Sequence, residues 1–186
     1  MVKNNKERFE LDLSENRKNM PEPNTDEDIR SKMRRGFNNK YVCFEYPFTW
    51  QELPKDEEDE FTDMLLFNKP NNAIVKISTQ PCLTNNMEDL KEEFEKDLKS
   101  KDCDIQQSVI DVLGGNEVYD IFYLTKEGLE VEQFSILKDN NLYTLELYSR
   151  NNRDPVAVKS FVELLQSFVI LKPRYKVDGD SYEQIE

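Results

Sequence analysis

The chain has 186 residues, 34% of them charged, and its 38 acidic and 25 basic side chains give a formal net charge of -13. This acidity argues against binding to nucleic acid or to an anionic membrane surface, because both interactions depend on Lys and Arg. Eleven Phe, eight Tyr and one Trp indicate a packed core, and the length predicts one domain with polar tails.

Residue types that enzymes use at reactive centres are scarce. The chain has no histidine, which removes the commonest general base and the commonest metal ligand. Cys43, Cys82 and Cys103 are widely spaced, so neither a zinc site nor a disulfide framework is indicated. We therefore expect no enzyme activity, no cofactor and no metal. No apolar run resembles a signal peptide or a membrane span, which predicts a cytoplasmic protein without membrane insertion.

Residues 1–37 are predicted to be a polar leader, because Asn, Lys and Glu dominate its first part. Thr25 followed by Asp28 is a capping signal, and Gly36 can close a helical turn. These residues favour a short helix over 26–35, with a frayed basic linker as the alternative.

The first segment expected to be ordered is the aromatic stretch 41–53. Its alternating positions predict one buried face of a strand, formed by Val42, Phe44 and Tyr46. Pro47 lacks an N–H and ends regular pairing. Trp50 is a candidate partner contact, because Trp is enriched in binding hot spots. In the alternative interpretation its ring is buried at the sheet edge.

A run of acidic residues follows this strand: Asp56, Glu57, Glu58, Asp59 and Glu60. Like charges in such a run repel one another and stay solvated. The run is a candidate surface for a basic protein partner or a weak site for a divalent cation, and a solvated loop without a binding role is the alternative. Beyond it, segments 61–67 and 73–79 predict two strands joined by a turn-rich Asn-Lys-Pro-Asn-Asn sequence.

The second half of the chain contains two helical segments. One is predicted over 87–99, where apolar residues spaced by three and four form a stripe: Met87, Leu90, Phe94 and Leu98. The other begins at Asp154-Pro155, an N-cap acid followed by proline at the first helical position. It is followed by a short strand at 169–171. Residues 173–186 are expected to be a loose acidic tail.

A meander of strands separates these helices. The pattern predicts strands over 109–113, 117–125, 129–137 and 141–149, with tight turns at Lys126-Glu127-Gly128 and Asp139-Asn140. Strands joined by such short turns must be antiparallel. The order of strands, helix, strands and helix therefore predicts an α+β domain over 38–172, with helices packed on an antiparallel sheet.

This order of elements resembles a known family. The punctuating residues are Tyr46-Pro47 with Trp50, Leu113-Gly114-Gly115 leading to Tyr119, and a closing Ser-Phe-Val-Ile at 167–170. The pattern is similar to the superfamily of the PsbP extrinsic protein of photosystem II and the Ran-binding Mog proteins, which also includes small bacterial domains. The resemblance covers residues 38–172 and implies an αβα sandwich around a central antiparallel sheet of about six or seven strands.

Members of this superfamily act mostly as binding or assembly factors. The resemblance therefore implies a non-catalytic protein-interaction domain, acting as an adaptor, assembly factor or chaperone. With the acidity of the chain, we expect a protein partner of basic character, contacted through Trp50 and the acids at 56–60. The alternative is a domain that binds a small ligand or a divalent ion in a cleft between sheet and helix.

Overall fold

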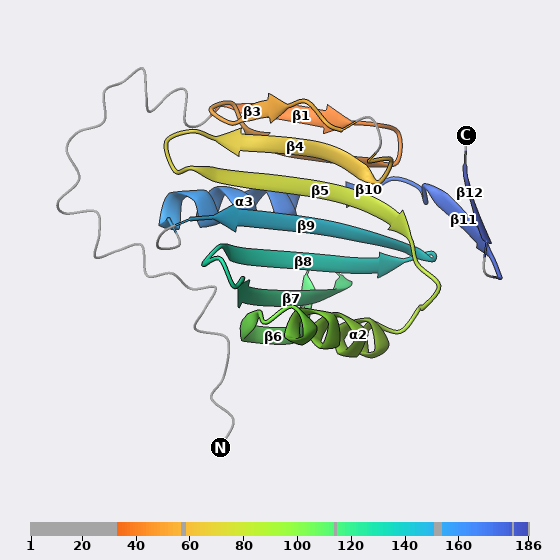
Figure 1. Ribbon diagram of the computed structural model, residues 1–186. Helices are drawn as coiled ribbons and strands as arrows, with labels where there is room; N and C mark the ends of the chain where they lie inside the picture. The colour runs from red at the N-terminus through yellow and green to blue at the C-terminus, as the bar shows by residue number, and fades with distance from the viewer. Residues whose placement is uncertain (1–32, 57–58, 114, 151–153, 180, 186) are drawn as a thin grey trace.

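A seven-stranded antiparallel sheet forms the centre of the fold, in the order β3-β4-β5-β9-β8-β7-β6 (Figure 1). The computed structural model describes residues 33–185 except 57–58, 114, 151–153 and 180. The strands of this sheet are β3 (Gln51–Leu53), β4 (Thr62–Asn68), β5 (Ala73–Pro81), β6 (Asp104–Leu113), β7 (Asn116–Leu124), β8 (Glu130–Lys138) and β9 (Asn141–Ser149).

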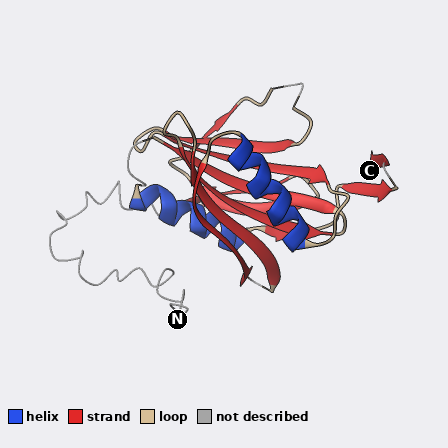
Figure 2. Cartoon of the chain, turned by 60° about the horizontal axis from the view of Figure 1, so that its bottom comes forward, coloured by secondary structure: helices blue, strands red, loops and turns tan. Residues whose placement is uncertain are grey.

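Helices lie on both faces of the sheet. One face packs against α3 (Pro155–Ser167) and a small sheet in the order β1-β2-β10. The strands of the small sheet are β1 (Arg34–Asn38), β2 (Val42–Pro47) and β10 (Val169–Ile170). The other face carries α2 (Met87–Ser100), which crosses the strands in Figure 2. The predicted α+β class, an αβα sandwich around an antiparallel sheet, is confirmed.

Two hydrophobic cores result from strand alternation, since successive side chains point to opposite faces of a sheet. On β5 and β9, Val75, Ile77, Leu145 and Leu147 point to the α3 side, where they join Phe44 and other residues of the small sheet. The α2 side contains a second core, formed by residues of α2 and of β7 and β8. In α2 these are Met87, Leu90 and Leu98, with Phe94 partly buried against them.

Local signals in the sequence explain the ends of these elements. The side chain of Asn86 caps α2 by accepting a hydrogen bond from Glu88 N, and Asp154 caps α3 in the same way. Asp139 and Asn140, between β8 and β9, both have positive φ, as a two-residue hairpin turn requires. These predicted helix starts and this predicted turn are confirmed.

The predicted helix over 26–35 is wrong at its C-terminal end, and residues 26–32 lie outside the described part of the chain. Arg34–Asn38 form strand β1, which pairs with β2 along its whole length. The ring of Phe37 lies 4.8 Å from that of Phe44. Pairing with an aromatic strand partly buries Phe37, whereas a short isolated helix is marginal in water.

The C-terminal residues also differ from the prediction of a loose tail. Tyr175–Asp178 (β11) and Ser181–Gln184 (β12) form an antiparallel hairpin. Tyr175 is buried, so the start of the hairpin is anchored to the domain. Within the described residues, none of the helices is both long and apolar enough to cross a bilayer.

Candidate functional site

Trp50 is a core residue, and its proposed role as a direct partner contact is corrected. Its side chain is 2% exposed and belongs to the core on the α3 side. A turn in which Trp50 N donates to Pro47 O directs the chain back towards the sheet. The alternative interpretation, a ring buried near the sheet edge, agrees with this position.

The two described side chains at the end of the acidic run bind within the protein. The Asp59 carboxylate accepts hydrogen bonds from Thr62 and is 3.2 Å from Lys76 Nζ. The hydrogen bond from Thr62 is the main reason why the pKa of Asp59 is lowered. Glu60 accepts a hydrogen bond from the Tyr182 hydroxyl in β12. Glu57 and Glu58 lie outside the described residues, and a partner-binding role for this run stays a prediction.

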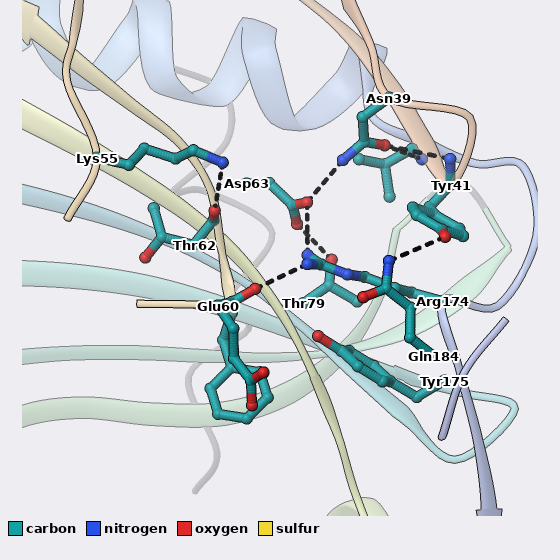
Figure 3. Close-up of polar contacts among 12 residues, drawn as sticks. Asn39, Tyr41, Lys55, Glu60, Thr62, Asp63, Thr79, Arg174, Tyr175 and Gln184 are labelled. Atoms are coloured by element: carbon teal, nitrogen blue, oxygen red, sulfur yellow. Dashed lines mark hydrogen bonds and ion pairs between the residues drawn. The ribbon is translucent and has the colours of Figure 1, made fainter. Parts of the chain in front are cut away.

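Beside this run, a buried ion pair joins the C-terminal hairpin to the central sheet (Figure 3). Arg174 Nη1 lies 3.0 Å from Asp63 Oδ1, and the two side chains are 13% and 2% exposed. Asp63 also accepts hydrogen bonds from Asn39 and Thr79. Burial raises the pKa of Asp63, while these hydrogen bonds and the guanidinium favour its charged form. Arg174 also donates to the main-chain oxygen of Glu60. This cluster holds the hairpin in place.

A groove of about 470 Å³ lies on the α2 side of the sheet. Its floor comes from the central strands β5, β9 and β8, and α2 forms one wall. Figure 1 shows that α2 lies over the β6–β7 side, while no helix among the described residues covers this face at β4 and β5. The groove therefore lies where the helix leaves the middle of the sheet uncovered, and we refer to it as the α2-side groove.

The floor of the α2-side groove is polar, although it lies at the centre of the sheet. Its polar side chains are Lys76, Ser78, Gln133, Ser135, Thr144 and Glu146. Strand register places Glu146 directly opposite Lys76 on one side and Gln133 on the other. Opposite residues in an antiparallel pair have Cβ atoms about 4.5–5.5 Å apart. The register thus places an ammonium, a carboxylate and an amide side by side.

Glu146 is the carboxylate at the centre of this row. Burial raises its pKa, and the hydrogen bond from the Tyr148 hydroxyl to Oε1, at 2.7 Å, opposes that rise together with the charge of Lys76. Lys76 is itself bonded to Asp59 at the sheet surface. The titratable groups around Glu146 come from the strands and from α2: Lys76, Glu93, Asp97, Tyr119, Tyr123 and Tyr148.

Gln133 has an unused hydrogen-bond acceptor at the floor of the groove. The residue is 3% exposed. Its Nε2 donates to Ser135 Oγ at 2.9 Å, while Oε1 is buried without a hydrogen-bond partner among the described residues. Leaving a buried acceptor unpaired costs about 1–3 kcal/mol. A ligand that donates a hydrogen bond to Oε1 would recover this loss.

These residues do not stand out in the sequence. Gln133 and Glu146 lie within the predicted strands over 129–137 and 141–149, and Lys76 lies within the predicted strand over 73–79. The signal in the sequence that could have indicated the site is the presence of polar residues at alternate positions of central strands, because strands covered on both faces are usually apolar throughout. Within the described residues, no group of three or more His, Cys, Asp or Glu is placed to hold a metal ion.

The chain matches no protein-family model and no curated protein. Its structure is similar to the solution structure of cyanobacterial PsbP (CyanoP) from Synechocystis sp. PCC 6803, with a TM-score of 0.57 and 13% identity over 76% of this chain and 93% of that chain. A structure from Bacteroides thetaiotaomicron VPI-5482 has a TM-score of 0.47, with 13% identity over 70% of this chain and 45% of that chain.

A third similar structure is a protein of unknown function from Pseudomonas aeruginosa, with a TM-score of 0.43 and 13% identity over 72% of this chain and 94% of that chain. At this low identity the likeness to cyanobacterial PsbP is one of fold. The PsbP-like fold expected from the order of elements is therefore confirmed. The Mog part of the resemblance stays a prediction.

Proposed function

We propose that this protein is a non-catalytic interaction domain that holds a protein partner with a basic segment, as an adaptor, assembly factor or chaperone. The observation that carries the proposal is the incomplete cover of one sheet face by the described residues. On the same face as the α2-side groove, β4 and β5 place three apolar residues that are at least partly exposed: Leu65, Phe67 and Ile74. A polar groove beside an apolar strip suits a polypeptide, which brings both kinds of side chain.

The charges around the groove favour a basic partner. Glu146 lies in the floor, and Glu93 and Asp97 project from α2. The one basic residue of the lining, Lys76, is paired with Asp59. Across the chain the formal net charge is -13. Complementary charges steer association and give it a strong dependence on salt.

Binding rather than catalysis is also supported by the surroundings of Glu146. Its hydrogen-bonding neighbour is the Tyr148 hydroxyl, and burial raises the pKa of Tyr148 far above neutral. Tyr148 therefore stays protonated and holds the carboxylate in place as a donor. A general acid–base pair instead needs two groups whose pKa values lie near the working pH.

Site-specific photo-crosslinking in the native cell tests this function. A photoreactive amino acid replaces Leu83, which lines the groove and is 63% exposed. The matched control is Val156 on α3, at the other side of the sheet, which is also 63% exposed. We expect one dominant protein to be captured at Leu83 and not at Val156, with less capture as the salt concentration rises. Capture of the same proteins at both positions, or of none at Leu83, would refute the proposal.

A small polar ligand is the second candidate. The observation that favours it is the groove volume of about 470 Å³, which lies in the usual range of small-molecule sites. Thermal unfolding of the full chain with a panel of polar metabolites separates the two functions. A metabolite that raises the melting temperature at millimolar concentration, together with no capture at Leu83, would favour the small ligand.

A further inference from the structure

Two acceptors stand side by side on the floor of the α2-side groove. Gln133 on β8 and Glu146 on β9 are directly opposite each other in the antiparallel register, and both line the groove. The amide oxygen of Gln133 is buried and unpaired among the described residues. The Tyr148 hydroxyl donates a hydrogen bond to Oε1 of Glu146, and a carboxylate can accept further hydrogen bonds. The pair therefore presents acceptors and negative charge to whatever enters.

The cation nearest to this pair in the sheet is directed elsewhere. Lys76 is opposite Glu146 in the β5–β9 register, but its Nζ is bonded to Asp59 at 3.2 Å. The pair of Gln133 and Glu146 thus keeps its capacity for a donor from outside. Anionic ligands are disfavoured here, because acceptor oxygens and carboxylates would repel them.

Aromatic and acidic side chains next to the floor suit the same kind of ligand. Phe94 of α2 and Tyr119 of β7 both line the groove, and their rings meet edge to face at 6.3 Å. Aromatic rings attract cations placed over their faces. Glu93 and Asp97, on the same helix, add negative charge at the wall.

We propose that the α2-side groove receives an arginine or lysine side chain of a partner polypeptide, whose N–H groups donate to Gln133 Oε1 and to the Glu146 carboxylate. This inference rests on the proposed function and names the chemistry by which the partner is recognised. The cationic group supplies the donor that Gln133 lacks and adds to the positive charge that Lys76 already places near Glu146. Phe94, which is partly exposed and backed by the buried ring of Tyr119, contacts the aliphatic stem or the face of the guanidinium.

The test is an NMR titration of the full chain with an end-capped Gly-Ser peptide that carries one central arginine. The same peptide with citrulline, which keeps the shape and loses the charge, is the control, and a lysine peptide is compared with its acetyl-lysine form. We expect the side-chain amide signals of Gln133 and the backbone signals of β8 and β9 to shift with the charged peptides. Charged hydrogen bonds contribute enough for affinity to exceed that of the neutral peptides by about tenfold or more.

Two variants separate recognition from folding. Glu146→Gln removes the charge and keeps the shape, and Gln133→Met removes the unpaired acceptor. Each should lower the affinity for the arginine peptide by about tenfold, because Glu146→Gln turns a charged acceptor into a neutral amide and Gln133→Met removes an acceptor altogether. Glu127→Gln, an exposed position in the β7–β8 turn, carries the same charge change and should leave the affinity unchanged. The melting temperature should not fall in Glu146→Gln, since a buried charge is removed.

The results that would overturn the inference are specific. Equal binding of the arginine and citrulline peptides would show that Gln133 and Glu146 do not recognise the charge of the arginine side chain. An equal loss of affinity in the Glu146 and Glu127 variants would show the same. Free N-acetyl-arginine methylamide binding as tightly as the peptide would mean that a small cation, not a polypeptide, is the ligand. If capture at Leu83 persists while these variants bind normally, the inference fails and the proposed function stands. Absence of capture at Leu83 in the protein without these variants refutes the function itself.

Discussion

Replacing Arg174 by methionine removes the cation that compensates Asp63 and retains most of the side-chain length. The carboxylate is 2% exposed and its partner guanidinium 13% exposed, so the charge left behind has almost no access to water. Breaking a buried ion pair from one side typically costs about 3–5 kcal/mol. Hydrogen bonds from Asn39 and Thr79 remain on Asp63, so we expect a loss near the lower limit, about 3 kcal/mol.

Urea unfolding at neutral pH, followed by circular dichroism, measures this loss as a fall in the transition midpoint at constant slope. The control is Lys176→Met, which breaks a 3.8 Å pair with Glu183 whose side chains are 68% and 74% exposed. That variant should change the free energy of unfolding by less than about 0.5 kcal/mol. Adding Asp63→Asn to the Arg174 variant should recover part of the loss, because the buried charge is then gone.

The pH dependence of this effect has a definite sign. Burial already raises the pKa of Asp63 in the folded state, and losing the guanidinium raises it further. A carboxyl with a raised folded pKa favours the folded state most at low pH and loses that contribution as the pH rises. The cost of Arg174→Met should therefore be largest at neutral pH and shrink as the pH falls through the raised pKa. A loss below about 1 kcal/mol at neutral pH would show that the hairpin is not held by this pair.

Three further predictions follow from packing, capping and the groove. Phe44→Ala should lower the free energy of unfolding by about 3–5 kcal/mol, since the ring is 2% exposed, and a loss below about 1 kcal/mol in urea unfolding would contradict its place in the core. Asp154→Ala should cost about 1 kcal/mol, because its side chain caps Val156 N and Ala157 N; Asp154→Asn, which retains a cap, should cost clearly less. Affinity for the arginine peptide should fall as the pH falls through the raised pKa of Glu146, because the carboxylate loses its charge. Lys76→Met should raise that affinity by about threefold at neutral pH, because it removes a charge of the same sign as the arginine. An unchanged affinity in both tests would contradict a charged Glu146 at the site.

Most of the fold could be predicted because its elements carry local signals. The stripe of α2, the Asp154-Pro155 start of α3 and the Asp139-Asn140 turn each depend on residues close together in the chain. β1 and the C-terminal hairpin could not be predicted in this way. Their order depends on distant partners, since Phe37 packs on β2 and Arg174 pairs with Asp63. Taken alone, the sequence of either segment contains mainly charged residues and residues typical of turns.

The candidate site was less accessible to prediction for the same reason. Glu146 meets Lys76 and Gln133 only through the registers of β5, β9 and β8. Trp50 and the acidic run were predicted to contact a partner because a single Trp and five consecutive acids are unusual in the sequence. In the structure Trp50 is buried, and Asp59 and Glu60 bind neighbouring segments. Unusual composition identified residues that hold the fold, whereas the groove is lined by ordinary polar residues.

The buried part of the polar floor is unexpected on physical grounds, since Gln133 is only 3% exposed. Buried side chains of a central strand are usually apolar, and β5 and β9 do carry apolar side chains on the α3 side. On the α2 side the same strands place a raised-pKa carboxylate beside an unpaired amide oxygen. Both features destabilise the protein when no ligand is bound, and the unpaired acceptor alone costs about 1–3 kcal/mol. A positively charged donor relieves both at once, whereas a neutral donor relieves only the second. Affinity in this groove should therefore depend more on the charge of the entering group than on its size.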